Sequence, residues 1–337
     1  MIITKTPFRM SFFGGGTDME SFFREHGGAV LSTTFDKYCY VNVRHLPRFF
    51  DYSTELSYAN TERVTSVDDI MHPAIRNAMK MLDMHEIRLT YEADLPARSG
   101  LGTSSSFAVG MLNAFYCLKG KYADKKKLAD EAIYLERVLC AEAGGWQDQI
   151  AASFGGFNRI NFNKDGTYDV IPLIIHPDRK KMLNDNLMMF FTGFTRFSSD
   201  LQKANAVGYA EKIAQLKEML ALVDEAERAL TDKHSDMDDF GRMLDNTWRL
   251  KRQTGGSITT SSIDELYEKG MKAGALGGKL LGAGGGGFLL FYVQPEKKAA
   301  VREAMNDLLY VPFRFEDGGT RVIHYTPESY IPKEEEE

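Results

Sequence analysis

The sequence predicts an α+β protein of two domains, and three observations support this prediction. With 337 residues, the chain is long enough for two domains or for one large one. Segments patterned as helices and as short strands follow one another without the regular alternation of a parallel sheet. Both patterns weaken between residues 165 and 185, which we interpret as the join between a domain at 1–175 and a domain at 176–330. An acidic tail at 331–337 follows.

The composition excludes several classes of protein. A formal net charge of -6 predicts no general affinity for nucleic acid, because no basic excess exists to displace counterions. The three cysteines, Cys39, Cys117 and Cys140, are scattered and favour a cytoplasmic setting without disulfides. No signal-peptide core or membrane-spanning apolar run is visible, so we expect no association with a membrane.

The first half of the chain is expected to hold strands that lead into helices. Residues 28–46 are rich in β-branched and aromatic side chains, and residues 87–95 alternate as a strand does. From Phe107 onward, apolar residues recur at helical spacing, and a second helix is expected over 124–142. The stretch LPARSGLGTSSS at 95–106 is therefore a turn from a strand into a helix.

The second half is expected to be mainly helical, with a few strands. These elements follow in the order strand 187–193, helical stretches 200–231 and 236–253, a further helix, a glycine loop, strand 288–293, helix 295–309 and a last strand near 320–325.

The turn at 95–106 has the features of an anion-binding loop. Free N–H groups and the helix dipole both favour negative charge at the start of a helix. Gly100 and Gly102 allow the backbone to approach a ligand closely, and the hydroxyls that follow can bind phosphate oxygens or a metal. The lysine of the Walker A motif is absent, which excludes an ordinary P-loop. A capped helix after a glycine turn remains an equal alternative for this stretch alone.

Three stretches of the chain, in order, resemble the motifs of one kinase superfamily, the GHMP kinases. LPARSGLGTSSS resembles their central motif, TPFRMSFFGGGTD at 6–18 their N-terminal motif, and KLLGAGGGGFLLF at 279–291 their C-terminal motif. The resemblance spans nearly the whole chain and implies the two-domain GHMP kinase fold. In that fold, an N-terminal domain like domain 2 of ribosomal protein S5 and a ferredoxin-like C-terminal domain hold the active site between them.

The resemblance also implies ATP as the phosphate donor. Its phosphates are expected on the loop made of Arg98, Ser99, Gly100, Leu101, Gly102, Thr103, Ser104 and Ser105. GAGGGG at 282–287 also fits the dinucleotide pattern GxGxxG, but that pattern requires a helix to follow and here a strand follows. Gly284 and Gly285 are instead expected to support the substrate from the second domain.

Asp148 is the candidate catalytic residue. A lone aspartate in a polar turn is commonly a cap, but GGWQDQIAASFGG at 144–156 resembles the family's region of the catalytic aspartate. One carboxylate there can either accept the proton of the acceptor hydroxyl or orient that hydroxyl while its proton leaves later. Arg9 matches a basic position that lies near this aspartate in relatives, where it would keep the carboxylate ionised and offset phosphoryl charge. A surface ion pair is the alternative for Arg9.

A magnesium site is expected from Ser104 and Glu136. Glu136 lies in LERVLC, where a solvated helix face is the alternative interpretation. ERV nonetheless resembles the family segment that carries a magnesium-ligating glutamate. Mg²⁺ takes one or two protein oxygens together with phosphate oxygens and waters, and these two side chains would supply them.

The resemblance also indicates the acceptor. Asp18, in the substrate-binding group Gly15, Gly16, Thr17 and Asp18, resembles the acid that hydrogen-bonds sugar hydroxyls in the sugar-kinase branch. Gly15 and Gly16 replace the Glu-His pair of galactokinases, which disfavours galactose. FGGGTD, GWQDQ with its following FGG, and TGFTRFSS at 192–199 look most like the D-glycero-D-manno-heptose 7-phosphate kinases. These act on the anomeric hydroxyl of a phosphorylated heptose, in making activated heptose for surface polysaccharides.

A phosphorylated sugar needs a cation at its far end. Arg196 is the first candidate, with Arg98 and Lys251 as alternatives, and each could equally be an ordinary exposed charge. Another sugar 1-kinase of fucokinase or galactokinase type, or a non-catalytic sugar sensor of the same fold, stays open. The expected partners are ATP and a small sugar phosphate, for a monomer or homodimer in the cytoplasm.

Overall fold

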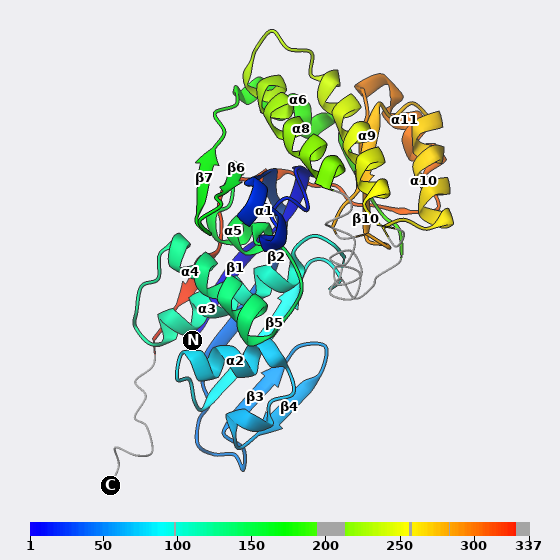
Figure 1. Cartoon of the computed structure of the whole chain (residues 1–337). Coiled ribbons are helices and arrows are strands. Elements are labelled where there is room, and N and C mark those ends of the chain that lie inside the picture. Colours follow the sequence, from blue (N-terminus) through cyan, green and yellow to red (C-terminus); the bar gives the residue numbers. More distant parts are fainter. Residues whose placement is uncertain (98, 194–212, 256–257, 283, 328–337) are drawn as a thin grey trace.

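The computed structural model describes residues 1–97, 99–193, 213–255, 258–282 and 284–327. Within these residues the strands form two sheets, one of nine strands and one of four. The larger sheet and its helices make up the first lobe, and the smaller sheet and its helices make up the second lobe (Figure 1). In the described part of the chain, no helix has the length and apolarity needed to cross a membrane.

Two long antiparallel strands organise the first lobe. The β-branched and aromatic residues that predict a strand at 28–46 form β2 (Gly28–His45), which pairs along most of its length with β1 (Ile2–Phe13). The length of β2 lets three further strands share its other side, β6 near its start, β12 in its middle and β5 near its end. The other strands of this sheet are β3 (Thr54–Ser57), β4 (Thr61–Val64), β5 (Ile87–Ala93), β6 (Phe157–Phe162), β7 (Tyr168–Pro172), β12 (Phe315–Glu316) and β13 (Arg321–Tyr325).

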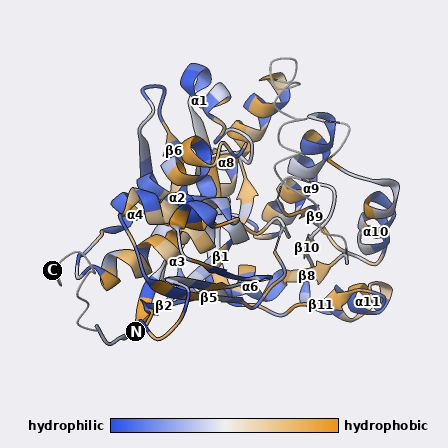
Figure 2. Ribbon diagram, turned by 90° about the horizontal axis from the view of Figure 1, so that it is seen from below, coloured by the Kyte–Doolittle hydropathy of each residue, from blue (hydrophilic) through white to orange (hydrophobic). Residues whose placement is uncertain are grey.

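An apolar helix, α3 (Thr103–Leu118), packs on β1 and β2 and is buried over almost all of its length. Its hydrophobic colouring in Figure 2 reflects this position. Gly110 allows the close approach, because a Cβ there would lie 2.7 Å from Thr6 Oγ1, and Thr4 Oγ1 donates to the Gly110 carbonyl at 2.9 Å. This contact fixes α3 against β1 and so places its N-terminus beside Arg9.

The remaining helices of the first lobe surround α3 and the sheet. Helix α4 continues into a π-helical turn, η2 (Tyr134–Leu139), an irregularity that is frequent at functional sites. The bounds of the others are α1 (Glu20–His26), η1 (Val67–Asp69), α2 (Pro73–Met81), α4 (Lys125–Ile133) and α5 (Gln147–Phe154).

The second lobe has the strand order β11-β8-β10-β9, and its central strand β10 is buried throughout. Helix α8 packs on β1 and β2 of the first lobe, and α9 packs on β1. At this junction, the ring of Phe240 lies edge-on to Phe12 and Phe13, with centroids 5.2 and 5.0 Å away. The bounds are α6 (Pro177–Asn186), β8 (Leu187–Phe191), α8 (Ile213–Thr231), α9 (Asp238–Gln253), α10 (Ser261–Lys272), β9 (Gly277–Leu280), β10 (Phe288–Tyr292), η4 (Pro295–Lys297), α11 (Lys298–Ala304) and β11 (Leu309–Tyr310).

The structure confirms the α+β prediction and most of its elements, with three differences. The first part of the helical stretch expected at 200–231, up to residue 212, lies outside the described residues. The stretch 165–185 is not irregular, because it contains β7 and α6. The helix expected over 295–309 is shorter, with α11 ending at Ala304. Strands β12 and β13 pair with β2 and β1, so the chain returns to the first lobe after β11. The division at 175/176 remains a prediction, and the tail at 331–337 lies outside the described residues.

Candidate active site

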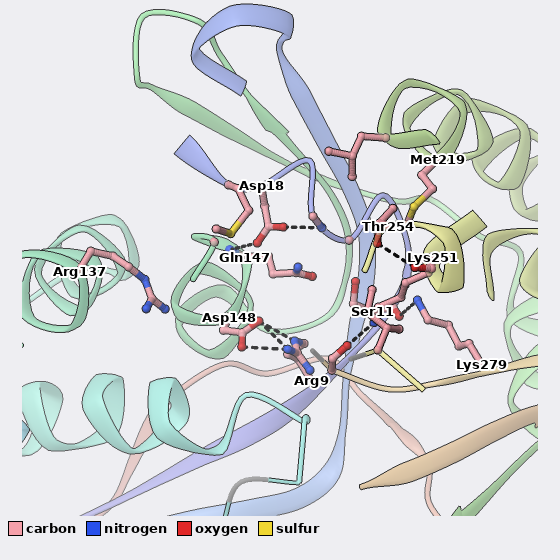
Figure 3. Close-up of a pocket in the computed structure, with 17 residues that line it drawn as sticks. Arg9, Ser11, Asp18, Arg137, Gln147, Asp148, Met219, Lys251, Thr254 and Lys279 are labelled. Carbon is pink, nitrogen blue, oxygen red and sulfur yellow. Dashed lines mark hydrogen bonds and ion pairs between the residues drawn. The ribbon is translucent and has the colours of Figure 1, made fainter. Parts of the chain in front are cut away.

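A pocket opens at the junction of the two lobes, where β1, the turn after it, α5, α8 and α9 meet (Figure 3). Side chains from both lobes line it, which explains why no single stretch of sequence describes it. Its charged lining residues from the first lobe are Arg9, Asp18, Arg137 and Asp148, and those from the second are Lys251 and Lys279.

Arg9 and Asp148 form a bidentate ion pair in this pocket. Arg9 Nε donates to Oδ1 of Asp148 at 2.7 Å, and Arg9 Nη2 donates to Oδ2 at 2.8 Å. Arg9 lies on β1 and is buried, whereas Asp148, on the first turn of α5, keeps 24% of its side chain exposed to the pocket. The alternative interpretation of Arg9, as a member of a surface ion pair, is therefore wrong. Such a bidentate pair fixes the orientation of the carboxylate.

The glycine loop before α3 lies directly against this ion pair. Gly100 and Gly102 have φ values of +81° and +73°, which glycine adopts without strain. Arg9 Nη1 donates to the Gly100 carbonyl at 2.7 Å, and a Cβ on Gly102 would lie 3.4 Å from Asp148 Oδ2. Ser99, Leu101 and Thr103 are buried in the loop's framework, whereas Ser104 is exposed at the helix start. Arg98 lies outside the described residues.

Glu136 is buried in a cluster of hydroxyl and amide donors. Ser104 Oγ donates to Oε1 at 2.7 Å, Ser105 Oγ donates to Oε2 at 2.7 Å, and Gln149 Nε2 also donates to Oε2. The side chain of Glu136 is only 1% exposed, so its interpretation as a solvated helix face is wrong. The nearest cationic group that the structure shows is Arg137 Nη2, at 3.9 Å. Within the described ranges no group of three or more His, Cys, Asp or Glu side chains is placed to hold a metal.

Asp18 lies on the other side of the pocket, held by backbone donors. Its carboxylate accepts from Gly16 N at 2.9 Å and from Gln147 N at 3.3 Å. Burial, together with the nearby charge of Asp148, raises the pKa of Asp18. Gly145 packs so closely that a Cβ there would lie 1.8 Å from Asp18 Oδ2. The carboxylate is thus fixed in place rather than free to turn to solvent.

Two buried polar atoms of residues that line the pocket lack partners. Ser11 Oγ and Gln147 Oε1 line the pocket, and neither has a hydrogen-bond partner in the described part of the chain. Buried polar atoms are costly to leave unsatisfied, so these two are suited to a hydroxylated ligand. Sequence reasoning missed both, although each lies within a recognised motif.

Some predicted substrate residues shape the pocket instead of lining it. Gly15 and Gly16 do line it, but the Thr17 hydroxyl is buried and donates to the carbonyls of Gly14 and Ala29. Gly284 and Gly285 are also buried, against the loop at Ile258, and Gly282 lines the pocket in their place. Arg196 lies outside the described residues.

Two family models match the chain. The model of the GHMP kinases N terminal domain matches residues 69–156, and the model of the GHMP kinases C terminal region matches residues 216–311. Together they cover more than half of the chain.

This chain is also similar to individual sugar kinases in sequence and in structure. The D-glycero-alpha-D-manno-heptose 7-phosphate kinase of Campylobacter jejuni is 28% identical over 319 residues, which is 90% of this chain and 93% of that protein. An L-fucokinase/L-fucose-1-P guanylyltransferase of Bacteroides fragilis is 29% identical over 64% of this chain but only 23% of its own length. A crystal structure described as a D-glycero-D-manno-heptose 1-phosphate kinase from Bacteriodes thetaiotaomicron has the same fold. It superposes with a TM-score of 0.77 at 24% identity, covering 96% of this chain and 99% of that one.

The matched models, the shared fold and the sugar kinases among the relatives converge on one family. This chain belongs to the GHMP kinases and is an ATP-dependent phosphotransferase of the sugar-kinase type.

Proposed function

We propose that this chain transfers a phosphoryl group from ATP to the anomeric hydroxyl of D-glycero-D-manno-heptose 7-phosphate. The product would be the 1,7-bisphosphate, an intermediate in making activated heptose for surface polysaccharide. The observation that carries this proposal is the similarity to the Campylobacter jejuni heptose 7-phosphate kinase along nearly the whole of both chains. The polar pocket around Asp18, with the unpartnered Ser11 Oγ and Gln147 Oε1, supports a hydroxyl-rich acceptor.

The reaction centre we propose is the Arg9–Asp148 pair beside the glycine loop. The acceptor hydroxyl would lie against Asp148, which accepts its proton as the oxygen attacks the γ-phosphorus of ATP. A new bond forms between that oxygen and phosphorus, and the bond from phosphorus to the β–γ bridging oxygen breaks, leaving its electron pair on ADP. The backbone amides at the start of α3 would hold the phosphates. Arg9 orients Asp148 and offsets the charge on the transferred group.

Ser104 and Glu136 fit a magnesium ion that binds with ATP. Ser104 Oγ and Glu136 Oε1 are 2.7 Å apart. In the described structure, the donors to the buried Glu136 carboxylate are the hydroxyls of Ser104 and Ser105 and the side-chain amide of Gln149. Oxygen atoms are the ligands that Mg²⁺ prefers. When bound, Mg²⁺ neutralises charge on the phosphate oxygens of ATP. The Ser104 hydroxyl, exposed at the helix start, would face the phosphates, and Ser105 and Gln149 would orient Glu136 from behind.

Removal of either magnesium ligand is expected to weaken the response to the metal. Ser104→Ala and Glu136→Gln should each raise the Mg²⁺ concentration for half-maximal activity by roughly tenfold or more, because one oxygen ligand or its charge is lost. The measurement is a magnesium titration of the steady-state rate at saturating ATP. Glu92→Gln, which changes an exposed carboxylate on β5, is the control and should leave the titration unchanged. Unchanged titrations in both site variants would remove these residues from the metal site.

A coupled assay of ADP release tests the substrate. D-glycero-D-manno-heptose 7-phosphate should give a kcat/KM about a hundredfold or more above those of the unphosphorylated heptose, L-fucose and galactose, because only the phosphorylated sugar forms a charge-assisted contact. A preference for L-fucose would favour the second candidate, a fucokinase-type enzyme, which the Bacteroides fragilis relative supports. Absence of turnover with every sugar, in a folded protein that still binds ATP, would favour a sugar-sensing role.

A further inference from the structure

A lysine of the second lobe reaches the glycine loop of the first. Lys251 lies on the last turn of α9, and its Nζ donates to the carbonyl of Gly282. Gly282 in turn packs on Gly100, because a Cβ on Gly282 would lie 2.3 Å from Gly100 Cα. The ammonium group of Lys251 is therefore held one residue away from the loop that we propose for the ATP phosphates.

Arg9 converges on the same point from the first lobe. Its Nη1 donates to the Gly100 carbonyl, and its charge lies close enough to Lys251 to affect that residue's pKa. Figure 3 shows both side chains extending into one pocket from opposite lobes. The charge of Arg9 is balanced by Asp148, whereas no ion pair of Lys251 is found among the described residues. Arg9 and Lys251 thus both face this pocket. Of the two carboxylates that line it, Asp148 is already paired with Arg9, and Asp18 lies close enough to raise the pKa of Lys251.

We propose that Lys251 is a further catalytic residue that binds the transferred phosphoryl group, on the side opposite Arg9. This inference rests on the proposed transfer at Asp148 but not on the identity of the sugar. As the bond from phosphorus to the ADP oxygen breaks and the bond to the acceptor oxygen forms, charge remains on the three other oxygens of the phosphoryl group. A fixed ammonium group beside those oxygens stabilises that charge at no cost of reorganisation.

The electrostatics of Lys251 fit an anionic ligand. Burial and the charge of Arg9 lower the pKa of Lys251 to about 8, against a raising contribution from Asp18. Lys279 of β9 is a second buried lysine near it. Burial, with the charges of Lys251 and Arg9, lowers the pKa of Lys279, and its Nζ donates to the carbonyls of Ser11 and Phe12 at 2.9 and 2.8 Å. A bound phosphoryl group would raise the pKa of Lys251 again, because its negative charge favours the charged ammonium. In the free enzyme, Lys251 loses its proton as the pH rises through about 8.

Kinetics of Lys251→Met and Lys251→Arg test the inference with whichever sugar the enzyme prefers. In Lys251→Met, kcat should fall about a hundredfold or more for phosphorylated and unphosphorylated sugars alike, with ATP affinity within about threefold of the wild type. Lys251→Arg should keep kcat within about tenfold. It should also remove the fall in kcat/KM near pH 8, because arginine stays charged there. Lys217→Met, which changes an exposed lysine on α8, is the control.

A second measurement needs no sugar, so it separates this inference from the proposed acceptor. Beryllium fluoride bound with ADP mimics the phosphoryl group, and Lys251→Met should lose its preference for ADP with beryllium fluoride over ADP alone. A loss confined to KM for the phosphorylated sugar would instead assign Lys251 to the sugar's own phosphate. If Lys251→Met leaves both kcat and the fall in kcat/KM near pH 8 unchanged, or only lowers the melting temperature, Lys251 has a structural role.

Discussion

Replacement of Asp148 by asparagine is expected to lower kcat about a hundredfold or more, with ATP affinity nearly intact. The amide keeps the size of the carboxylate but can neither accept the hydroxyl proton nor carry the negative charge that orients Arg9. The substitution should weaken stabilisation of the transition state and leave ATP binding intact. The glycine loop, where we propose that ATP binds, is hydrogen-bonded to Arg9 and continues into α3, and it does not depend on Asp148. Steady-state kinetics and ATP titration of the same preparation measure both quantities.

The same substitution should also reduce stability, since Arg9 is 5% exposed and would lose its counter-charge. We expect a loss of roughly 1–3 kcal/mol, because the partly exposed Asp148 is screened by solvent. Asp69→Asn, at an exposed carboxylate of η1, is the matched control for both measurements. A near-normal kcat in Asp148→Asn would overturn the proposed mechanism.

Gly282→Ala is expected to damage both the fold and the activity. Gly282 has a φ of +85°, and an added Cβ would lie 2.3 Å from Gly100 Cα. The backbone strain alone costs roughly 1–3 kcal/mol. The clash adds about 1–3 kcal/mol or displaces the glycine loop that carries Gly100. We expect a melting temperature lower by several degrees and a kcat/KM reduced about a hundredfold, as small displacements of reacting groups have effects of that size.

Gly120→Ala is the control that separates the effect of backbone strain from the effect of the clash between the two glycine loops. Gly120 has a comparable φ of +65°, but no atom lies within 4 Å of the position its Cβ would take. This variant should therefore lose some stability through the backbone alone and keep its kinetics. If Gly282→Ala behaves in the same way as Gly120→Ala, the contact between the two glycine loops is not needed for catalysis.

The parts of the site that could be predicted are those whose chemistry is local. Glycines, hydroxyls and a helix start within one short stretch identify the loop at 99–105, because an anion-binding turn is built from neighbouring residues. The proximity of Arg9 to Asp148 followed from family resemblance, since 139 residues separate them along the chain. Their roles, and that of Glu136, remain predictions.

The rest could not be predicted because it depends on contacts between distant segments. Nothing near Lys279 in the sequence indicates that its ammonium group would be buried on the carbonyls of Ser11 and Phe12, 268 and 267 residues away. The same holds for the return of β12 and β13 to the first sheet. The strand and helix within 165–185 were not predicted for another reason, since the turn residues and charges of this stretch conceal a short exposed strand and a polar helix.

The return of β13 to β1 has a consequence for how the chain folds. Ile2 pairs with Tyr325, and the amino group of Met1 donates to the carbonyl of Thr326, 325 residues further on. Such pairing is slow, because the entropy of closing so large a loop is lost before the contact forms. During synthesis, β1 keeps one unpaired edge until the whole second lobe has emerged, and an open strand edge is a template for aggregation. Completion of the first sheet is therefore tied to the folding of the second lobe.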